Sequence, residues 1–267
     1  MRLGPIDLDR TLGCGQVFRW RKEGEVWKGI VKGKELRLRQ EGTSIVAEGR
    51  TDDEALERYF RSDDDLDRIR AEISRDERIA SMVANAPGLR LIRQDPWECA
   101  ASYVLATNAN IPRIQKMIEN VCRTFGDPLP GGGFAFPRPD QISGGNEAAK
   151  ACGLGFRCDR FVEFARLVDR GEIGLETLRK ADYEECVREL RSCPGIGDKV
   201  ADCVAVFSLD HLDAFPVDVR IKKAMEEMYG VCGTYRSVNR FGREYFGRYA
   251  GYAQEYIYYS FQRIKRV

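Results

Sequence analysis

The first fifty residues alternate between short hydrophobic runs and polar turns. The runs QVFRW, VWKGIV, ELRLRQ and SIVAEG are rich in β-branched and aromatic residues, and GEV, KGKE and EGTS separate them. Runs of this length with such separators are typical of strands joined by tight turns. The pattern predicts an antiparallel meander of roughly four or five strands.

From Thr51 onward the spacing of the hydrophobic positions becomes helical. TDDE has the form of a capping box, with Thr51 as the N-cap and Glu54 closing the box. Further helices are predicted over residues 76–88, 95–108, 111–126, 157–171, 181–193, 198–209, 216–230 and 251–265, with a loop over 133–143. The fold class is therefore α+β, with an antiparallel β domain and its flanking helices over 1–85 and a helical domain over 86–267.

Composition narrows the class of protein. The chain has 267 residues, 43% hydrophobic and 32% charged, as expected for a soluble globular protein. No apolar run reaches the ~18 residues of a membrane helix, and the first residues lack the apolar core of a secretory signal. Nine cysteines, an odd number, indicate free and mostly buried thiols in a reducing cytosol. A single histidine, His211, excludes sites that need two or three imidazoles.

The net charge of +1 does not by itself indicate any particular partner, but the charged residues are unevenly distributed along the chain. Residues 52–77 carry an excess of acidic side chains, and residues 236–267 carry an excess of basic ones. The basic C-terminal end permits a local anionic partner, although a solvated charged face is the more common cause of such runs.

The segment CPGIGDKVADC predicts a tight turn between two helices, a hairpin over about residues 184–209. Gly195 and Gly197 allow positive φ and a close approach to something bulky. The second helix then begins with free N–H groups, which bind phosphate. Such a hairpin holds a nucleic-acid backbone without reading its sequence. A purely structural turn between helices explains the residues PGIG equally well.

Lys199 follows this turn at an unfavourable place for a cation. The N-terminal end of a helix disfavours an ammonium by about 0.3–1 kcal/mol, and Asp198 is the residue type that stability favours there. The same field favours the neutral amine, which is a nucleophile and forms Schiff bases. The alternative is a surface lysine whose head reaches away from the helix end.

Asp218 lies shortly after a proline, at the start of the next predicted helix. Its carboxylate is either an N-cap or an acid–base and electrostatic partner for a cation that forms in the site, and both roles are compatible.

These motifs resemble a known family. CPGIGDKVADC followed by AFPVDV is similar to the helix-hairpin-helix DNA glycosylases with the Gly/Pro-then-Asp signature, and the lysine marks their bifunctional branch. LGCGQVFRW, DPWECAASYVLATNANIPRIQKMIENVCRTFG and CGLGFR resemble the eukaryotic-type 8-oxoguanine DNA glycosylases. The resemblance spans nearly the whole chain. It implies a small TBP-like N-terminal sheet domain before the helical domain, and a monomer that binds double-stranded DNA containing oxidised guanine.

The resemblance also implies a chemistry. The damaged guanine is flipped out of the duplex, Lys199 attacks the anomeric carbon of its sugar, and Asp218 stabilises the cationic sugar. A Schiff base remains, and β-elimination nicks the strand, which is AP lyase activity. Four residues are carried over as lining the base pocket: Gly15, Cys203, Gln254 and Tyr258, the last in place of the family's stacking phenylalanine.

Several positions are carried over as DNA contacts. Asn108, Arg113 and Arg157 resemble residues around the orphaned cytosine, although Ala109 breaks the family's run of asparagines. Phe156 stands where the family has a tyrosine wedge, and an apolar wedge still unstacks bases. The remaining candidates are Arg220, which replaces a histidine, and the hairpin residues Gly195, Gly197 and Val200.

No cofactor is predicted. Cys186 and Cys193 have the first spacing of the iron–sulfur cluster of related glycosylases, but no C-x-x-C follows, so neither that cluster nor zinc is expected. The resemblance allows a structural monovalent or divalent cation at the hairpin, held by backbone carbonyls. The compartment would be the cytoplasm, at the nucleoid, in a prokaryote and the nucleus in a eukaryote.

Two alternatives stay open. One is a helix-hairpin-helix glycosylase for another damaged base, such as an alkylated one. Lys199 argues against it, because alkylation relatives generally lack that lysine. The other is a non-catalytic module that only holds DNA, which needs neither Lys199 with Asp218 nor Gly15 with Gln254.

Overall fold

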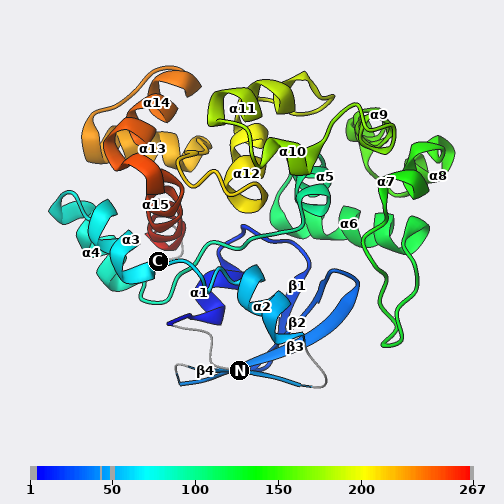
Figure 1. The fold of residues 1–267 in the computed structure, drawn as a ribbon, viewed down its shortest axis with the longest axis horizontal. Coiled ribbons are helices and arrows are strands. Elements are labelled where there is room, and N and C mark those ends of the chain that lie inside the picture. The colour runs from blue at the N-terminus through cyan, green and yellow to red at the C-terminus, as the bar shows by residue number, and fades with distance from the viewer. Residues whose placement is uncertain (1–4, 43, 49–51, 265–267) are drawn as a thin grey trace.

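The computed structural model describes residues 5–42, 44–48 and 52–264. A four-stranded antiparallel sheet of order β1-β2-β3-β4 lies at one end of the molecule, and helices fill the rest (Figure 1). The strands are β1 Trp20–Glu23, β2 Val26–Val31, β3 Lys34–Glu41 and β4 Ser44–Ala47. The predicted α+β fold with an N-terminal meander is therefore confirmed.

One face of the sheet forms a small core of its own with α2 (Asp53–Tyr59). Trp20 lies across its cross-strand partner Gly29, where a Cβ would be only 2.3 Å from the Trp20 ring. The Trp20 indole donates to the Tyr59 hydroxyl at 2.8 Å, which joins the sheet to α2.

The start of α2 differs from the prediction. Its N-cap is Asp52, whose side chain accepts from the Ala55 amide, so the capping box predicted on Thr51 is wrong. Thr51 itself lies outside the described residues. Aspartate caps a helix as well as threonine or better, so Asp52 is as suitable as the N-cap of α2 as the predicted Thr51.

The other regular elements of the described chain are helices, and the bounds of those that were predicted follow the prediction closely in most places. They are α1 Leu8–Gly13, α3 Leu66–Ile73, α4 Glu77–Asn85, α5 Pro96–Ala106, α6 Ile111–Phe125, α7 Pro139–Ser143, α8 Asn146–Ala151, α9 Cys158–Asp169, α10 Leu175–Leu178, α11 Tyr183–Ser192, α12 Asp198–Ser208, α13 Val219–Tyr229, α14 Tyr235–Phe246 and α15 Ala250–Ile264, with single turns η1 Gly155–Arg157 and η2 Gly247–Tyr249.

Within the loop predicted over 133–143, the structure has the short helix α7. Pro139 takes the first position of α7, where a missing N–H costs nothing, and the Gln141 side chain accepts from the Arg138 amide at 2.8 Å. Helices α1, α3, α8, α10 and α14 were also not predicted.

The hairpin of α11 and α12 stands in the middle of the helical part (Figure 1). Helices α5, α6 and α9 lie on one side of it, and α13, α14 and α15 lie on the other with α3 and α4. The buried residues of α3 and α4, such as Ile69 and Val83, belong to the helical core and not to the sheet core. The domain boundary predicted between residues 85 and 86 stays a prediction.

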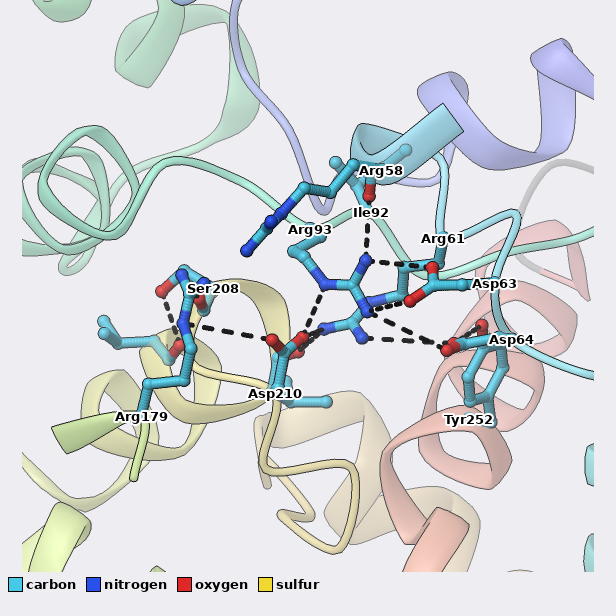
Figure 2. A network of polar contacts seen from close by, with 12 residues as sticks. Arg58, Arg61, Asp63, Asp64, Ile92, Arg93, Arg179, Ser208, Asp210 and Tyr252 are labelled. Atoms are coloured by element: carbon cyan, nitrogen blue, oxygen red, sulfur yellow. Dashed lines mark hydrogen bonds and ion pairs between the residues drawn. The ribbon is translucent and has the colours of Figure 1, made fainter. Parts of the chain in front are cut away.

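A network of three arginines around Asp210 anchors the C-terminal end of α12 (Figure 2). Arg61, in the turn between α2 and α3, is fully buried; it contacts the Asp210 carboxylate at 2.8 Å and donates to the Val206 carbonyl at 3.2 Å. Arg93 donates to the same carboxylate at 2.7 Å, and Arg179 donates to the Ser208 carbonyl at 2.9 Å. Burial alone would raise the pKa of Asp210, but Arg61 and Arg93 lower it below its ordinary value.

A buried acid, Asp202, holds α12 to its neighbours. Its carboxylate accepts from the Tyr183 hydroxyl of α11 at 2.6 Å, from the Asn239 amide of α14 at 3.0 Å, and from the Tyr235 hydroxyl. Burial raises the pKa of Asp202 to about 6, against these hydrogen bonds. Helix α12 is thus fixed along its length by polar contacts as well as by packing.

Candidate active site and DNA interface

The hairpin turn brings the start of α12 to an open face with its amides uncapped. Gly195 has φ of +84°, and a Cβ there would lie 3.1 Å from Val104 and 3.3 Å from Arg160, so the position needs glycine. Gly197 is the N-cap of α12 with extended backbone, φ −99°, so positive φ was wrongly expected for it. No side chain among the described residues caps α12, so its first N–H groups are free to bind an anion.

Lys199 is in the first turn of α12, half-buried, with Nζ 5.2 Å from the centroid of the Tyr103 ring. Its head therefore lies over an aromatic face and does not reach away into solvent as the surface alternative requires. Cys203, one turn further along the same face of α12, is buried. Burial raises the pKa of the Cys203 thiol to about 12, and the charge of Lys199 opposes this rise.

Asp218 is the N-cap of α13, and its Oδ1 accepts from the Ile221 amide at 2.8 Å. The same carboxylate acts electrostatically on Cys203, on Tyr258 and on Glu255. The capping role is therefore observed, and Asp218 and Lys199 both act electrostatically on the Cys203 thiol.

This double role separates two substitutions. Asp218→Asn keeps a good cap but removes the charge, so single-turnover base release should fall roughly 100-fold while stability changes by less than about 0.5 kcal/mol. Asp218→Ala should show the same kinetic loss and an additional loss of about 1 kcal/mol in urea unfolding. Equal stability of the two variants would contradict the capping role.

Gly15 lies beside Tyr258, and Gln254 is buried one turn before Tyr258 on α15. Gly15 has φ of +104°, and a Cβ there would approach Ile111 Cδ1 at 3.1 Å and the Tyr258 hydroxyl at 3.9 Å. Gln254 is buried, and its Oε1 has no hydrogen-bond partner among the described residues. An unpartnered buried amide oxygen is costly unless a ligand supplies a donor, which suits a residue that reads a base edge.

Arg220 donates to the Tyr258 hydroxyl at 2.6 Å, and its guanidinium lies 5.3 Å from the centre of the Tyr258 ring. The hydroxyl that distinguishes Tyr258 from the family's phenylalanine is therefore used, and it holds Arg220 at the edge of the pocket.

Tyr258→Phe tests the use of that hydroxyl. The ring face remains for stacking while one hydrogen bond is lost, so stability should fall by about 1 kcal/mol. Single-turnover excision should stay within about threefold of wild type. A loss of excision above tenfold would show that the hydroxyl itself is needed by the substrate.

Four DNA-contact candidates lie in two segments, Asn108 and Arg113 around the start of α6 and Phe156 and Arg157 in η1. Arg157 donates Nε to the Thr107 carbonyl at 2.8 Å and a terminal nitrogen to the Asn108 carbonyl at 3.2 Å, and its guanidinium lies 4.3 Å from the centre of the Phe156 ring. Arg113 reaches the Gly153 carbonyl at 3.5 Å. Asn108 is exposed with φ of 52°. Arg157 is buried, so here it braces the loop, and a contact to a cytosine would require it to leave these carbonyls.

Phe156 is 58% exposed and Val219, directly after Asp218, is 86% exposed. Large apolar side chains in such positions are available to an unstacked base or a sugar. Val219 was not predicted. Val200 is buried, so its side chain belongs to the core and only its backbone amide could contact DNA.

A cavity of about 150 Å³ lies elsewhere, between the sheet and α5. Its walls include Phe18, Trp20, Tyr59, Arg93 and Glu98, and none of the predicted site residues. It is therefore not the base pocket.

Comparison with known proteins agrees with this geometry. The N-terminal domain family of 8-oxoguanine DNA glycosylase matches residues 2–100. N-glycosylase/DNA lyase OGG1 of Arabidopsis thaliana is 30% identical over 285 residues, which cover 95% of this chain and 76% of that protein. This chain belongs to the 8-oxoguanine DNA glycosylase family.

Solved structures extend the family match. The 8-oxoguanine glycosylase/lyase of Clostridium acetobutylicum, in complex with double-stranded DNA containing cytosine opposite 8-oxoG, superposes with a TM-score of 0.93 at 32% identity, covering 99% of this chain and 94% of that one. The 3-methyladenine DNA glycosylase of Archaeoglobus fulgidus has a TM-score of 0.80 at 22% identity over 100% of this chain and 99% of that one, which shows a shared fold. The predicted family membership is confirmed.

The cysteines of this family member are free, eight of them buried and Cys232 exposed. Burial raises the pKa of Cys186 to about 12 and of Cys193 to about 11. Among the described residues, no three His, Cys, Asp or Glu side chains are grouped to hold a metal ion. None of the described helices is long and apolar enough to cross a membrane.

The sequence analysis did not single out Glu255, a buried acid that directly follows Gln254 on α15. Its signal was present in YAQEY, since Tyr252, Tyr256 and Ile257 leave little of α15 to face solvent. A charged residue inside such a run has to be read as buried.

Proposed function

We propose that this glycosylase-family member excises 8-oxoguanine opposite cytosine and then nicks the strand as an AP lyase. The observation that carries the proposal is that the Lys199 ammonium lies over the Tyr103 ring at the start of α12, while Lys199 and Asp218, the N-cap of α13, both act electrostatically on the buried Cys203 thiol. A lysine over an aromatic ring with a carboxylate nearby is equipped for attack on a sugar carbon that becomes cationic.

The reaction follows from these groups. The neutral amine of Lys199 attacks C1′, the N-glycosidic bond breaks, and its electron pair leaves with the base, which takes up a proton. The Asp218 carboxylate stabilises positive charge on the sugar. The amine loses a proton as the sugar ring opens to a Schiff base. Loss of a C2′ proton then breaks the C3′–O bond, and water releases Lys199.

The base would be recognised on two edges. Gly15 supplies a carbonyl for the N–H that oxidation adds to the five-membered ring, where plain guanine has an acceptor, so guanine is rejected by repulsion. Gln254, with its unpartnered oxygen, faces the pyrimidine edge, and Tyr258 stacks on the ring. The free amides of α12 hold the phosphate.

The experiment is excision from three duplexes, carrying 8-oxoguanine, guanine or 3-methyladenine in the same sequence, with borohydride added to trap the Schiff base. Release and trapping are expected with 8-oxoguanine alone. No release from that duplex would overturn the proposal, and a gel shift without release would favour the DNA-holding module. Release of 3-methyladenine would favour the alternative of a helix-hairpin-helix glycosylase for an alkylated base.

Three further features belong to this proposal. The protein acts as a monomer, which light scattering on a single-lesion duplex would check, and it acts where chromosomal DNA is kept.

The chemistry needs no cofactor, so excision should persist in EDTA. A cation held by the carbonyls of the hairpin turn would show as a dependence of DNA affinity on the identity of the salt.

A further inference from the structure

Tyr103 contacts Lys199 from the buried side of the site. It lies on α5, is 4% exposed, and the centre of its ring is 5.2 Å from Lys199 Nζ. No carboxylate of the described residues pairs with this ammonium. Because the face of an aromatic ring attracts positive charge, the Tyr103 ring holds the nitrogen in place where a counter-ion would otherwise do so.

Two other rings fix the Tyr103 ring in turn. Phe207, further along α12 than Lys199, stacks nearly parallel to it with the ring centres 6.0 Å apart. Phe18 meets it edge-on at 5.4 Å. Close packing of this kind restricts a buried side chain to one rotamer. The surface under Lys199 Nζ is therefore rigid.

The Tyr103 hydroxyl reaches the turn that contains Gly15. It donates to the Gln16 carbonyl at 3.2 Å, and the Gln94 amide donates to the same oxygen at 2.9 Å. The Gln16 side chain is buried as well, and it accepts from the Ile92 amide at 2.8 Å. Gln16 directly follows Gly15, so these hydrogen bonds fix the backbone next to the glycine.

We propose that Tyr103 is a positioning residue that aligns the nucleophile with the base pocket. Its ring holds Lys199 Nζ as an ammonium in the free site and as a cationic Schiff base after attack on C1′. Its hydroxyl holds the Gln16 backbone, and with it the Gly15 carbonyl that receives the base. The inference rests on the function proposed above and adds to it a residue that links base recognition to the attacking amine.

Two variants separate the ring from the hydroxyl. Tyr103→Phe keeps the ring and loses only the hydroxyl, whereas Tyr103→Leu loses both. Two substrates separate the steps. Borohydride trapping on a duplex with a preformed abasic site reports Schiff-base formation with no base to recognise. Single-turnover release from an 8-oxoguanine duplex reports recognition and attack together.

The two variants should behave differently on the two substrates. Tyr103→Phe should trap within about twofold of the wild-type rate, because the ring remains. It should release 8-oxoguanine about fivefold more slowly, because the turn at Gly15 has lost a hydrogen bond. Tyr103→Leu should trap about tenfold more slowly, and its release of 8-oxoguanine should fall by about the product of the two losses, roughly fiftyfold.

Phe207→Leu is the matched control. It removes a ring from the same cluster but leaves the ring of Tyr103 under Lys199 Nζ. Urea unfolding should therefore show a loss of stability in both leucine variants, while trapping by Phe207→Leu stays within about threefold of wild type. A merely structural role of Tyr103 would make the two leucine variants lose trapping equally.

Wild-type trapping by Tyr103→Leu overturns the inference, and so does an equal loss of trapping in Tyr103→Phe and Tyr103→Leu. Unchanged release of 8-oxoguanine by Tyr103→Phe also overturns it, and this outcome is decisive even where Tyr103→Leu does not fold. A wild type that neither traps on the abasic duplex nor releases 8-oxoguanine would instead overturn the proposed function, and this inference with it.

Discussion

Lys199→Gln is expected to abolish borohydride trapping on an 8-oxoguanine duplex and to slow base release roughly 10³-fold or more. Glutamine keeps the length and polarity of the side chain but has no nucleophilic amine. The measurement is single-turnover release with and without borohydride.

DNA affinity separates this loss from a loss of binding. The uncapped amides of α12 remain in Lys199→Gln, so its affinity for the duplex should stay within about tenfold of wild type. Lys223→Gln, at an exposed lysine of α13 that pairs with Glu227, is the matched control and should retain release and trapping. Trapping that persists in Lys199→Gln would assign the nucleophile to another amine.

Arg61→Met should lower the free energy of unfolding by about 3–5 kcal/mol. The substitution removes a fully buried guanidinium from between Asp210 and the Val206 carbonyl and leaves these groups without one of their donors (Figure 2). Urea unfolding measures the loss. A change below about 1 kcal/mol would mean that Arg93 and Arg179 hold Asp210 without Arg61.

Arg58→Met is the control for that loss. Arg58 is exposed, and it is the backbone carbonyl of this residue that accepts from Arg93, so its substitution should cost less than about 0.5 kcal/mol.

Acid should erase the difference in unfolding free energy between wild type and Arg61→Met. The folded pKa of Asp210 is lowered, so the contribution of its ion pairs is complete above 3.8 and is lost as pH falls through the folded value.

The elements that carry the chemistry could be predicted because their signals are local. A proline, two glycines and a lysine at a helix start mark the hairpin, and an aspartate before a helical run marks Asp218, which is indeed an N-cap. Alternating runs predicted the sheet for the same reason, since side chains two apart share a face.

The features that were missed depend on contacts between distant segments. Arg157 carries a charge in a polar motif, yet the carbonyls of Thr107 and Asn108, fifty and forty-nine residues away, draw it into the interior. Glycine is the residue type that most readily adopts positive φ, but Gly197 is the N-cap of α12 and has an extended backbone. The apolar neighbours of Glu255 in α15 indicate that it is enclosed, but the helices that bury it, α3, α4, α13 and α14, come from distant parts of the chain.

The burial of the cysteines has a consequence for durability. Oxidants react with the thiolate, and a thiol that is enclosed with its pKa raised stays protonated and out of reach. Cys203, inside the pocket, is protected in this way, whereas Cys232 is exposed in the segment that joins α13 to α14. An enzyme whose substrate is itself a product of oxidation would then meet oxidative stress with a single vulnerable thiol, outside the pocket, and would remain active when lesions are most frequent.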